Sequence, residues 1–159
     1  MERLPGLVDL ETFGLVNLIA RSPELAGPDS GDWALVNASP GYLTVLFFRA
    51  GSLCFYRSKT VADDERAPEK FHPALRRELA SCAGFYREHL SGTSLERAVL
   101  RTSNGESRFL PGMVQEELAC PVVALDPAKA VTLPPGSDPT DPTWQFLAPA
   151  LGAALGRFP

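Results

Sequence analysis

Apolar and polar residues alternate along this chain in short runs that predict strands first and helices later. Three runs in the first third are rich in β-branched and aromatic residues and are separated by turn formers, which is typical of strands. They cover Trp33–Ala38, Tyr42–Phe48 and Leu53–Arg57. Both connections between them are short, and Gly51 in the second is available for the positive φ angle of a hairpin turn.

The rest of the chain alternates helical and strand-like segments. The strongest helical pattern covers Glu69–Leu90, where apolar residues recur every three or four positions. Weaker patterns predict helices at Glu11–Ala20, Pro111–Leu118 and Trp144–Leu155, and strands at Ala98–Leu100 and Pro121–Leu125. Pro149 is expected to kink the last helix or to mark its true start.

This order of elements predicts an α/β fold. Hairpins among the first three strands imply antiparallel pairing, whereas strands separated by helices imply parallel pairing. We therefore expect a mixed five-stranded sheet, ordered βββαβαβα, with helices on both faces. That is the layout of a ribonuclease H-like layer, the core unit of actin-like ATPases. Residues 1–32 are expected to form an N-terminal helix and linker, and residues 33–159 a single domain.

Composition and charge exclude several classes of function. The 159 residues carry a net charge of −4 with acidic and basic residues interleaved, which argues against electrostatic binding of nucleic acid. No window approaches the ~20 consecutive apolar residues of a membrane span, and the first residues do not resemble a signal peptide. The three cysteines suit small buried side chains in a reducing compartment better than disulfides. We expect a cytoplasmic protein.

Two turns are where this architecture would place a ligand, and the first follows the first strand. A phosphate or metal loop there needs an acidic residue, and glycines that let backbone N–H groups approach phosphate oxygens. The turn offers Asn37, Ser39, Gly41 and Thr44 but no carboxylate, and Pro40 removes one N–H. These features favour an ordinary hairpin turn.

The second turn follows the fourth strand and could face a nucleotide base or ribose. It contains Ser103, Asn104 and Gly105. A loop that approaches a ligand closely usually needs two or three glycines, and this one has a single glycine. A solvated connection between strand and helix is the interpretation that these residues favour.

The remaining polar clusters predict neither a metal site nor a catalytic residue. Asp63, Asp64 and Glu65 form a charge run of the kind that is usually solvated. His72 and His89 lack a second His or Cys at the spacing that zinc requires, so both are expected on the surface of the long helix. Four aromatic residues on strands are expected to pack in the core, namely Phe47, Phe48, Phe55 and Tyr56.

Several short motifs occur in a fixed order along nearly the whole chain. They are Val8–Leu15, Trp33–Asn37, Leu46–Gly51, Phe55–Arg57, Leu75–Leu79, Phe85–Arg87, Leu110–Met113, Glu116–Leu118, Pro121–Val122 and Ala150–Leu155. In this order they resemble the PilM-type proteins, the actin-like proteins of type IV pilus assembly. That group is related to FtsA and to the cytoplasmic domains of pilus and type II secretion platform proteins. The resemblance covers only the second half of the family's usual length.

The departures from the family pattern affect its nucleotide site. The family's Asp-Ile-Gly phosphate loop corresponds to residues 37–39 here, and its glycine-rich adenosine loop to residues 103–105. Its first phosphate loop would lie before Met1. The subdomain that the family inserts after the third strand is replaced by residues 59–68. The resemblance therefore implies an actin-like fold that lacks the opposite wall and the acidic magnesium anchor of the nucleotide cleft.

These observations predict a non-catalytic actin-like scaffold or assembly module. It would belong to a type IV pilus or type II secretion-like inner-membrane platform, and it would act by protein–protein binding without a cofactor. The resemblance implies partners among pilus or secretion platform proteins, foremost a single-pass inner-membrane protein, and a peripheral place on the inner membrane. Oligomers are possible. The exposed sheet edge and residues 134–142 are the expected contact candidates.

Two alternatives remain. In the first, the chain is the nucleotide-binding half of an actin-like ATPase with ATP and magnesium as cofactors. Asn37, Ser39, Gly41 and Thr44 would then hold phosphates, and residues 103–105 would approach the base. The second alternative, a nuclease of ribonuclease H type, is disfavoured because Asn37 stands where the first catalytic acid should be.

Overall fold

The computed structural model describes residues 10–22, 24–25, 31–39, 41–60, 68–103 and 107–155. Its elements in chain order are α1 (Leu10–Arg21), β1 (Asp32–Ser39), β2 (Tyr42–Arg49), β3 (Ser52–Thr60), α2 (Pro68–His89), β4 (Arg97–Thr102), η2 (Ser107–Phe109), α3 (Leu110–Leu118), β5 (Val122–Ala124), α4 (Pro127–Ala130) and α5 (Thr143–Ala154). They fall into two compact units. Residues 27–125 form the sheet unit, and residues 1–26 with 126–159 form the helical unit.

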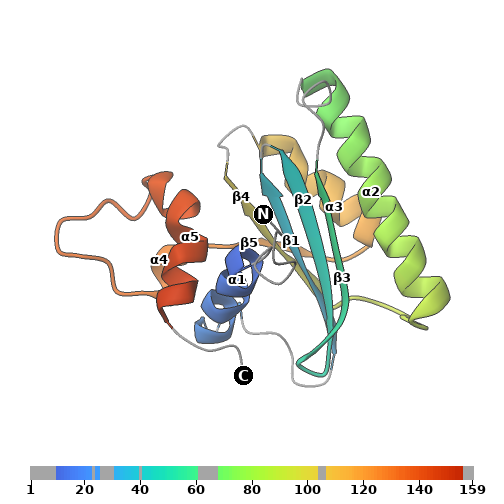
Figure 1. The fold of residues 1–159 in the computed structure, drawn as a ribbon, viewed down its shortest axis with the longest axis horizontal. Coiled ribbons are helices and arrows are strands. Elements are labelled where there is room, and N and C mark those ends of the chain that lie inside the picture. The colour runs from blue at the N-terminus through green and yellow to red at the C-terminus, as the bar shows by residue number, and fades with distance from the viewer. Residues whose placement is uncertain are drawn as a thin grey trace, which may run out of the picture. The chain divides into compact units, whose positions relative to one another are not determined.

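The sheet unit contains all five strands, in the order β3-β2-β1-β4-β5 (Figure 1). β2 runs antiparallel to both β1 and β3, whereas β4 pairs in parallel with β1 and with β5. The connections explain this pattern, because hairpins join the first three strands and helices precede the last two. The predicted α/β class and mixed five-stranded sheet are confirmed.

Burial follows the position of each strand in the sheet. β1 and β2 occupy interior positions and are buried along almost their whole length. Phe47 and Phe48 lie in the core as predicted. The same prediction is wrong for Tyr56, which is 41% exposed, because β3 is an edge strand with a neighbour on one side only. Phe55 on the same strand is half-buried.

One face of the sheet carries a hydrophobic core together with α2 and α3 (Figure 1). Alternate residues of the central strands, such as Val36 and Val45, join Leu79 from α2 and Val114 from α3 in this core. Every second residue of a strand thus points into the same core as helix residues spaced three or four positions apart. Pro111 lies in the first turn of α3, where its missing N–H costs no helical hydrogen bond.

The helical unit is built around the packing of α1 against α5. The Asn17 side chain on α1 donates a hydrogen bond to the carbonyl oxygen of Gly152 on α5 at 3.2 Å. α5 already begins at Thr143, so the alternative that Pro149 marks its start is wrong. The four-residue α4 was not predicted, because a single turn has no periodicity. The Asp126 carboxylate caps this helix by accepting a hydrogen bond from the Ala128 N–H at 3.0 Å.

The compact units group residues differently from the predicted domains, since α4 and α5 share a unit with α1. A boundary between independently folding domains at residue 32 stays a prediction, as does the coverage of the second sheet face by helices. Throughout the described ranges, none of the helices combines the length and apolar character that a membrane crossing requires.

Candidate functional site

A row of polar side chains crosses the sheet near the carboxyl ends of β1 and β4. The strand register places Asn37 directly opposite Thr44 on β2 and Arg101 on β4, and Thr44 directly opposite Ser58 on β3. Residues directly opposite one another share a face of the sheet. Ser58, Thr44, Asn37 and Arg101 therefore form one continuous line, which we call the polar row.

Arg101 forms the β4 end of the polar row. Its side chain is 2% exposed, and one terminal nitrogen donates to Asn37 Oδ1 at 3.0 Å and to Ser39 Oγ at 2.9 Å. Next to these residues, the hydroxyl groups of Thr44 and Ser58 lie 3.0 Å apart and share a hydrogen bond. The structure thus brings together three of the residues predicted for the first turn, Asn37, Ser39 and Thr44, and adds an arginine.

This arrangement is unsuited to holding a magnesium ion. The polar row presents an amide oxygen and hydroxyl groups to a guanidinium, whose fixed positive charge repels a second cation. The acceptor oxygens of Asn37 and Ser39 are already occupied by Arg101. The Asn37 Nδ2 atom is buried and has no hydrogen-bond partner in the part of the chain that the structure describes.

The other predicted ligand residues flank the polar row. Gly41 is buried in the turn between β1 and β2 with φ of 100°, a conformation that favours glycine. Ser103 follows β4, and its N–H donates to the Ala38 carbonyl oxygen at 3.3 Å. Asn104 and Gly105 lie outside the described residues. That these residues contact a nucleotide stays a prediction.

Sequence reasoning missed Arg101, although one signal was present. The strand pattern Ala98-Val99-Leu100 is apolar and buried, and Arg101 continues it as a charged residue before the strand ends. A charged residue inside a buried strand needs a partner. Its partners come from a strand more than 60 positions earlier, and only the sheet order makes them neighbours.

A groove of about 560 Å³ lies between α2 and the segment formed by η2 and α3. We call it the α2–α3 groove; it is lined by His72, Pro73, Arg76, Arg108, Phe109, Gly112, Met113 and Glu116. Phe109 is 66% exposed, and its ring centre lies 5.5 Å from that of His72. A volume of this size is within the range of small-molecule sites.

Ion pairs close one side of the α2–α3 groove. The Arg76 guanidinium contacts Glu116 at 2.8 Å and Glu117 at 2.9 Å, and hydrogen bonds to Glu116 raise the pKa of Arg76. His89 at the end of α2 is exposed, as predicted, whereas His72 is half-buried at the groove. The groove thus offers two rings and several charges but no carboxylate pair free of a cation.

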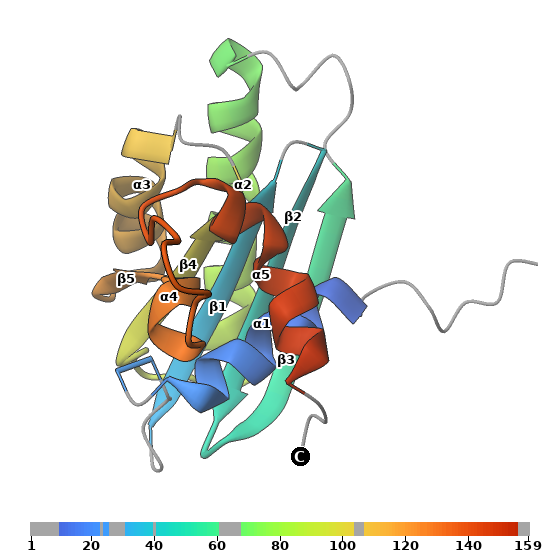
Figure 2. The ribbon, with the colours of Figure 1, turned by 90° about the vertical axis from the view of Figure 1, so that its left-hand side faces the viewer.

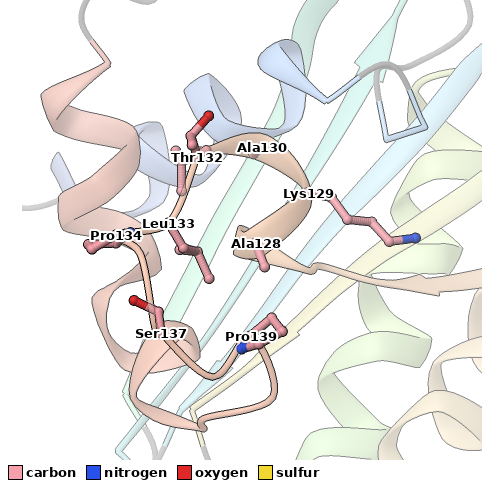
Figure 3. Close-up of a pocket in the computed structure, with 9 residues that line it drawn as sticks. Ala128, Lys129, Ala130, Thr132, Leu133, Pro134, Ser137 and Pro139 are labelled. Carbon is pink, nitrogen blue, oxygen red and sulfur yellow. The ribbon is translucent and has the colours of Figure 1, made fainter.

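The helical unit contains a second hollow of about 550 Å³, in the segment that joins α4 to α5 (Figure 3). Its lining includes Leu133, Pro134, Ser137 and Pro139, which bring no charged group. Lys129 borders it, and its ammonium group pairs with Glu24 at 2.6 Å. This composition carries no catalytic chemistry.

In the described ranges, no three His, Cys, Asp or Glu side chains are grouped so that they could hold a metal ion. The acidic run Asp63–Glu65 lies outside those ranges. The cysteines Cys54, Cys82 and Cys120 are free thiols. Cys82 and Cys120 are buried, as expected of small core side chains, whereas Cys54 is half-buried.

Comparisons with known proteins place the fold. No protein-family model and no curated protein matches the sequence. Among solved structures, a chain of the PilM-PilN type IV pilus biogenesis complex matches with a TM-score of 0.64 and 18% identity, over 96% of this chain and 52% of that chain. Ta0583, an archaeal actin homolog, matches with a TM-score of 0.56 and 10% identity, over 89% of this chain and 52% of that one.

A third structure, the ethanolamine utilization protein EutJ from Carboxydothermus hydrogenoformans, matches with a TM-score of 0.50 and 10% identity over 91% of this chain and 53% of that chain. The chain therefore spans about half the length of the solved structures it resembles. At these identities the likeness concerns the fold alone. The protein has an actin-like fold, and its architecture is similar to that of a chain in the PilM-PilN complex.

Proposed function

We propose that this chain is a non-catalytic actin-like assembly module that works by binding other proteins. The observation that carries the proposal is the buried contact of Arg101 with Asn37 and Ser39. A nucleotide-hydrolysing site of this architecture would need an acidic group there to hold a metal-bound water. Here the positively charged guanidinium of Arg101 occupies the acceptor oxygens of Asn37 and Ser39, where that site would need a negative charge.

A pilus or secretion platform is the setting that the fold comparison favours. The solved structure with the TM-score of 0.64 is a complex of two pilus biogenesis proteins, so the same fold takes part in a protein assembly there. We extend this to the present chain and propose a single-pass inner-membrane platform protein as its partner. The chain would then sit at the cytoplasmic side of that membrane and require no cofactor.

Calorimetry with two ligands tests this function. The purified chain is titrated with ATP and magnesium, and separately with the soluble cytoplasmic segment of a single-pass inner-membrane pilus platform protein from the same organism. We expect saturable heat from the protein segment and none from ATP. Saturation by ATP at low micromolar concentration, or no binding of the platform segment, contradicts the proposal.

The α2–α3 groove supports a second candidate, the nucleotide-binding half of an actin-like ATPase. Its exposed Phe109 ring beside His72 could stack a flat heterocycle, and Arg108 lies next to Phe109. In that case adenosine alone would bind, and the substitution Phe109→Ala would remove the binding. Phe85→Ala is the matched control, because Phe85 is also an exposed aromatic residue but does not line the groove.

A further inference from the structure

Among the residues that the structure describes, β3 is an edge strand with a neighbour on one side only. None of its nine residues is buried, whereas the neighbouring β2 is buried along most of its length. The opposite edge, β5, has only three residues. Figure 2 shows β3 as the last strand on its side of the sheet. An edge strand presents backbone N–H and C=O groups that can pair with another chain.

The hairpin before β3 determines which backbone groups point outward. Ala50 and Gly51 have φ angles of 46° and 75°, so both central residues of the two-residue turn are left-handed. Such a turn makes the flanking residues Arg49 and Ser52 a hydrogen-bonded pair. Because bonding alternates along an antiparallel ladder, every second residue of β2 counted from Arg49 bonds to β3.

The register then assigns the inward and outward residues of β3. Phe55, Arg57 and Lys59 lie opposite the bonding residues of β2 and direct their backbone groups inward. The residues between them, Tyr56 and Ser58, and also Thr60, direct theirs away from the sheet. The irregularity at Phe47/Phe48 precedes this stretch and leaves its alternation intact.

The described side chains beside this edge, Arg57, Lys59 and Glu78, carry surplus positive charge. Arg57 and Lys59 both bind the carboxylate of Glu78, at 2.8 and 2.7 Å. The two cationic side chains are 43% and 41% exposed, whereas that of Glu78 is 10% exposed. Two cations thus share one carboxylate that is itself shielded from solvent, and the surplus charge faces outward.

This charge pattern selects among possible occupants of the edge. A second copy of the chain, paired antiparallel, would bring the Arg57 and Lys59 of both copies onto one face at close spacing, where like charges repel. A strand with carboxylates at alternate positions would instead place them against both cations, since alternate residues of a strand share a face.

We propose that the β3 edge binds an extended acidic segment of a partner protein, which adds to the sheet as a sixth strand. Backbone pairing with Ser58 and Thr60 would supply affinity, and Arg57 with Lys59 would select acidic side chains. The inference rests on the proposed function in one respect, that the module works by binding proteins.

A synthetic probe tests the acidic preference. A fluorescein-labelled peptide of four Val-Glu repeats is titrated with the full chain and followed by fluorescence anisotropy, with four Val-Lys repeats as the charge control. We expect saturable binding of the Val-Glu peptide that weakens with added salt, and none of the Val-Lys peptide. Absence of Val-Glu binding, or equal binding of both peptides, would overturn the proposal.

Three variants locate the binding site. Lys59→Ala should weaken Val-Glu binding about two- to fivefold, the size expected for one exposed charge pair. Glu78→Gln removes the carboxylate that competes for Arg57 and Lys59, and it should strengthen binding by a similar factor. Arg76→Ala is the control, because it breaks an arginine–glutamate cluster that lies away from β3 and should leave affinity unchanged. Unchanged affinity in the first two variants would contradict the site.

Amide hydrogen exchange measured by NMR separates strand addition from a mere ionic contact. The Val-Glu peptide should slow exchange at Ser58 and Thr60. Binding without this protection overturns the proposal, and so does protection that rises with protein concentration in the absence of peptide, because that indicates a second copy. If the platform segment binds Lys59→Ala as tightly as the unmodified chain, the proposed function stands and the β3 site falls.

Discussion

Gly14 and Gly152 lie directly against each other where α1 crosses α5. A Cβ atom added to Gly152 would overlap the carbonyl group of Gly14, and one added to Gly14 would overlap the carbonyl oxygen of Pro149. The two helix backbones therefore touch without intervening side chains. The hydrogen bond from Asn17 to the Gly152 carbonyl fixes the same crossing.

Gly152→Ala should destabilise the helical unit by about 1–3 kcal/mol, because the new methyl group forces the two backbones apart. Gly84→Ala is the matched control. Gly84 also lies within a helix, nothing lies within 4 Å of its added Cβ, and the substitution should stabilise α2 by about 0.5–1 kcal/mol. Chemical denaturation of both variants measures the difference, and equal effects would contradict the close crossing.

Replacing Arg101 by methionine should cost about 2 kcal/mol or more, because Asn37 and Ser39 would keep buried acceptors without donors. The effect should shrink when Ser39 is already alanine, since one acceptor is then gone. A double-mutant cycle in urea measures this coupling, which we expect at about 0.5–1.5 kcal/mol. Strictly additive effects would show that Arg101 and Ser39 act independently.

Asp32 should make stability depend on acid pH. Hydrogen bonds from Arg49 hold the pKa of Asp32 below its ordinary value, burial opposes this, and the Tyr86 hydroxyl, which donates at 2.6 Å, adds to the lowering. A lowered pKa means that the stabilisation is complete above the unfolded-state pKa and is lost as pH falls through the folded-state pKa. Urea unfolding between pH 6 and pH 2 should show this loss in the unmodified chain.

Asp32→Asn is the variant that isolates this effect. It should be less stable at neutral pH and should show a shallower decline in acid. Tyr86→Phe should keep most of the slope, because the hydrogen bonds from Arg49 remain. An Asp32→Asn variant with an undiminished slope would assign the acid sensitivity to other carboxylates.

The three thiols should differ in reactivity. Burial raises the pKa of Cys82 and of Cys120 to about 11, so little reactive thiolate forms at either position at pH 8. Cys54 on the edge strand is half-buried. Alkylation with iodoacetamide followed by peptide mass spectrometry should therefore modify Cys54 first, and the other two only in denaturant. Simultaneous modification in the native state would contradict their burial.

The periodicity of the chain was sufficient to predict the sheet. Continuous apolar runs such as that of β1 correspond to strands buried on both faces, and the connections fixed which pairs are parallel. The exposure of Tyr56 could not be predicted, because it depends on β3 being the last strand in the order. Likewise, the tight packing of α1 on α5 depends on two glycines 138 positions apart, and local patterns carry no information about such a pair.

The candidate site was predicted only in part. The residue types at Asn37, Ser39 and Thr44 indicated a turn without an acid. The structure places Asn37 and Thr44 in the polar row, and Ser39 accepts a hydrogen bond from Arg101 at its end. The role of Arg101 required the register between β1 and β4, which the sequence does not contain. The α2–α3 groove was missed for a similar reason, since its walls come from separate helices.

The division into two units has a consequence for synthesis. The sheet unit is one continuous stretch of chain, whereas the helical unit is assembled from segments on either side of it. During translation the five strands can pair as soon as β5 has left the ribosome, but α1 cannot pack against α5 until α5 has been synthesised. A nascent chain halted before α5 would therefore present α1 without its partner helix, which makes α1 the segment that we expect a chaperone to bind.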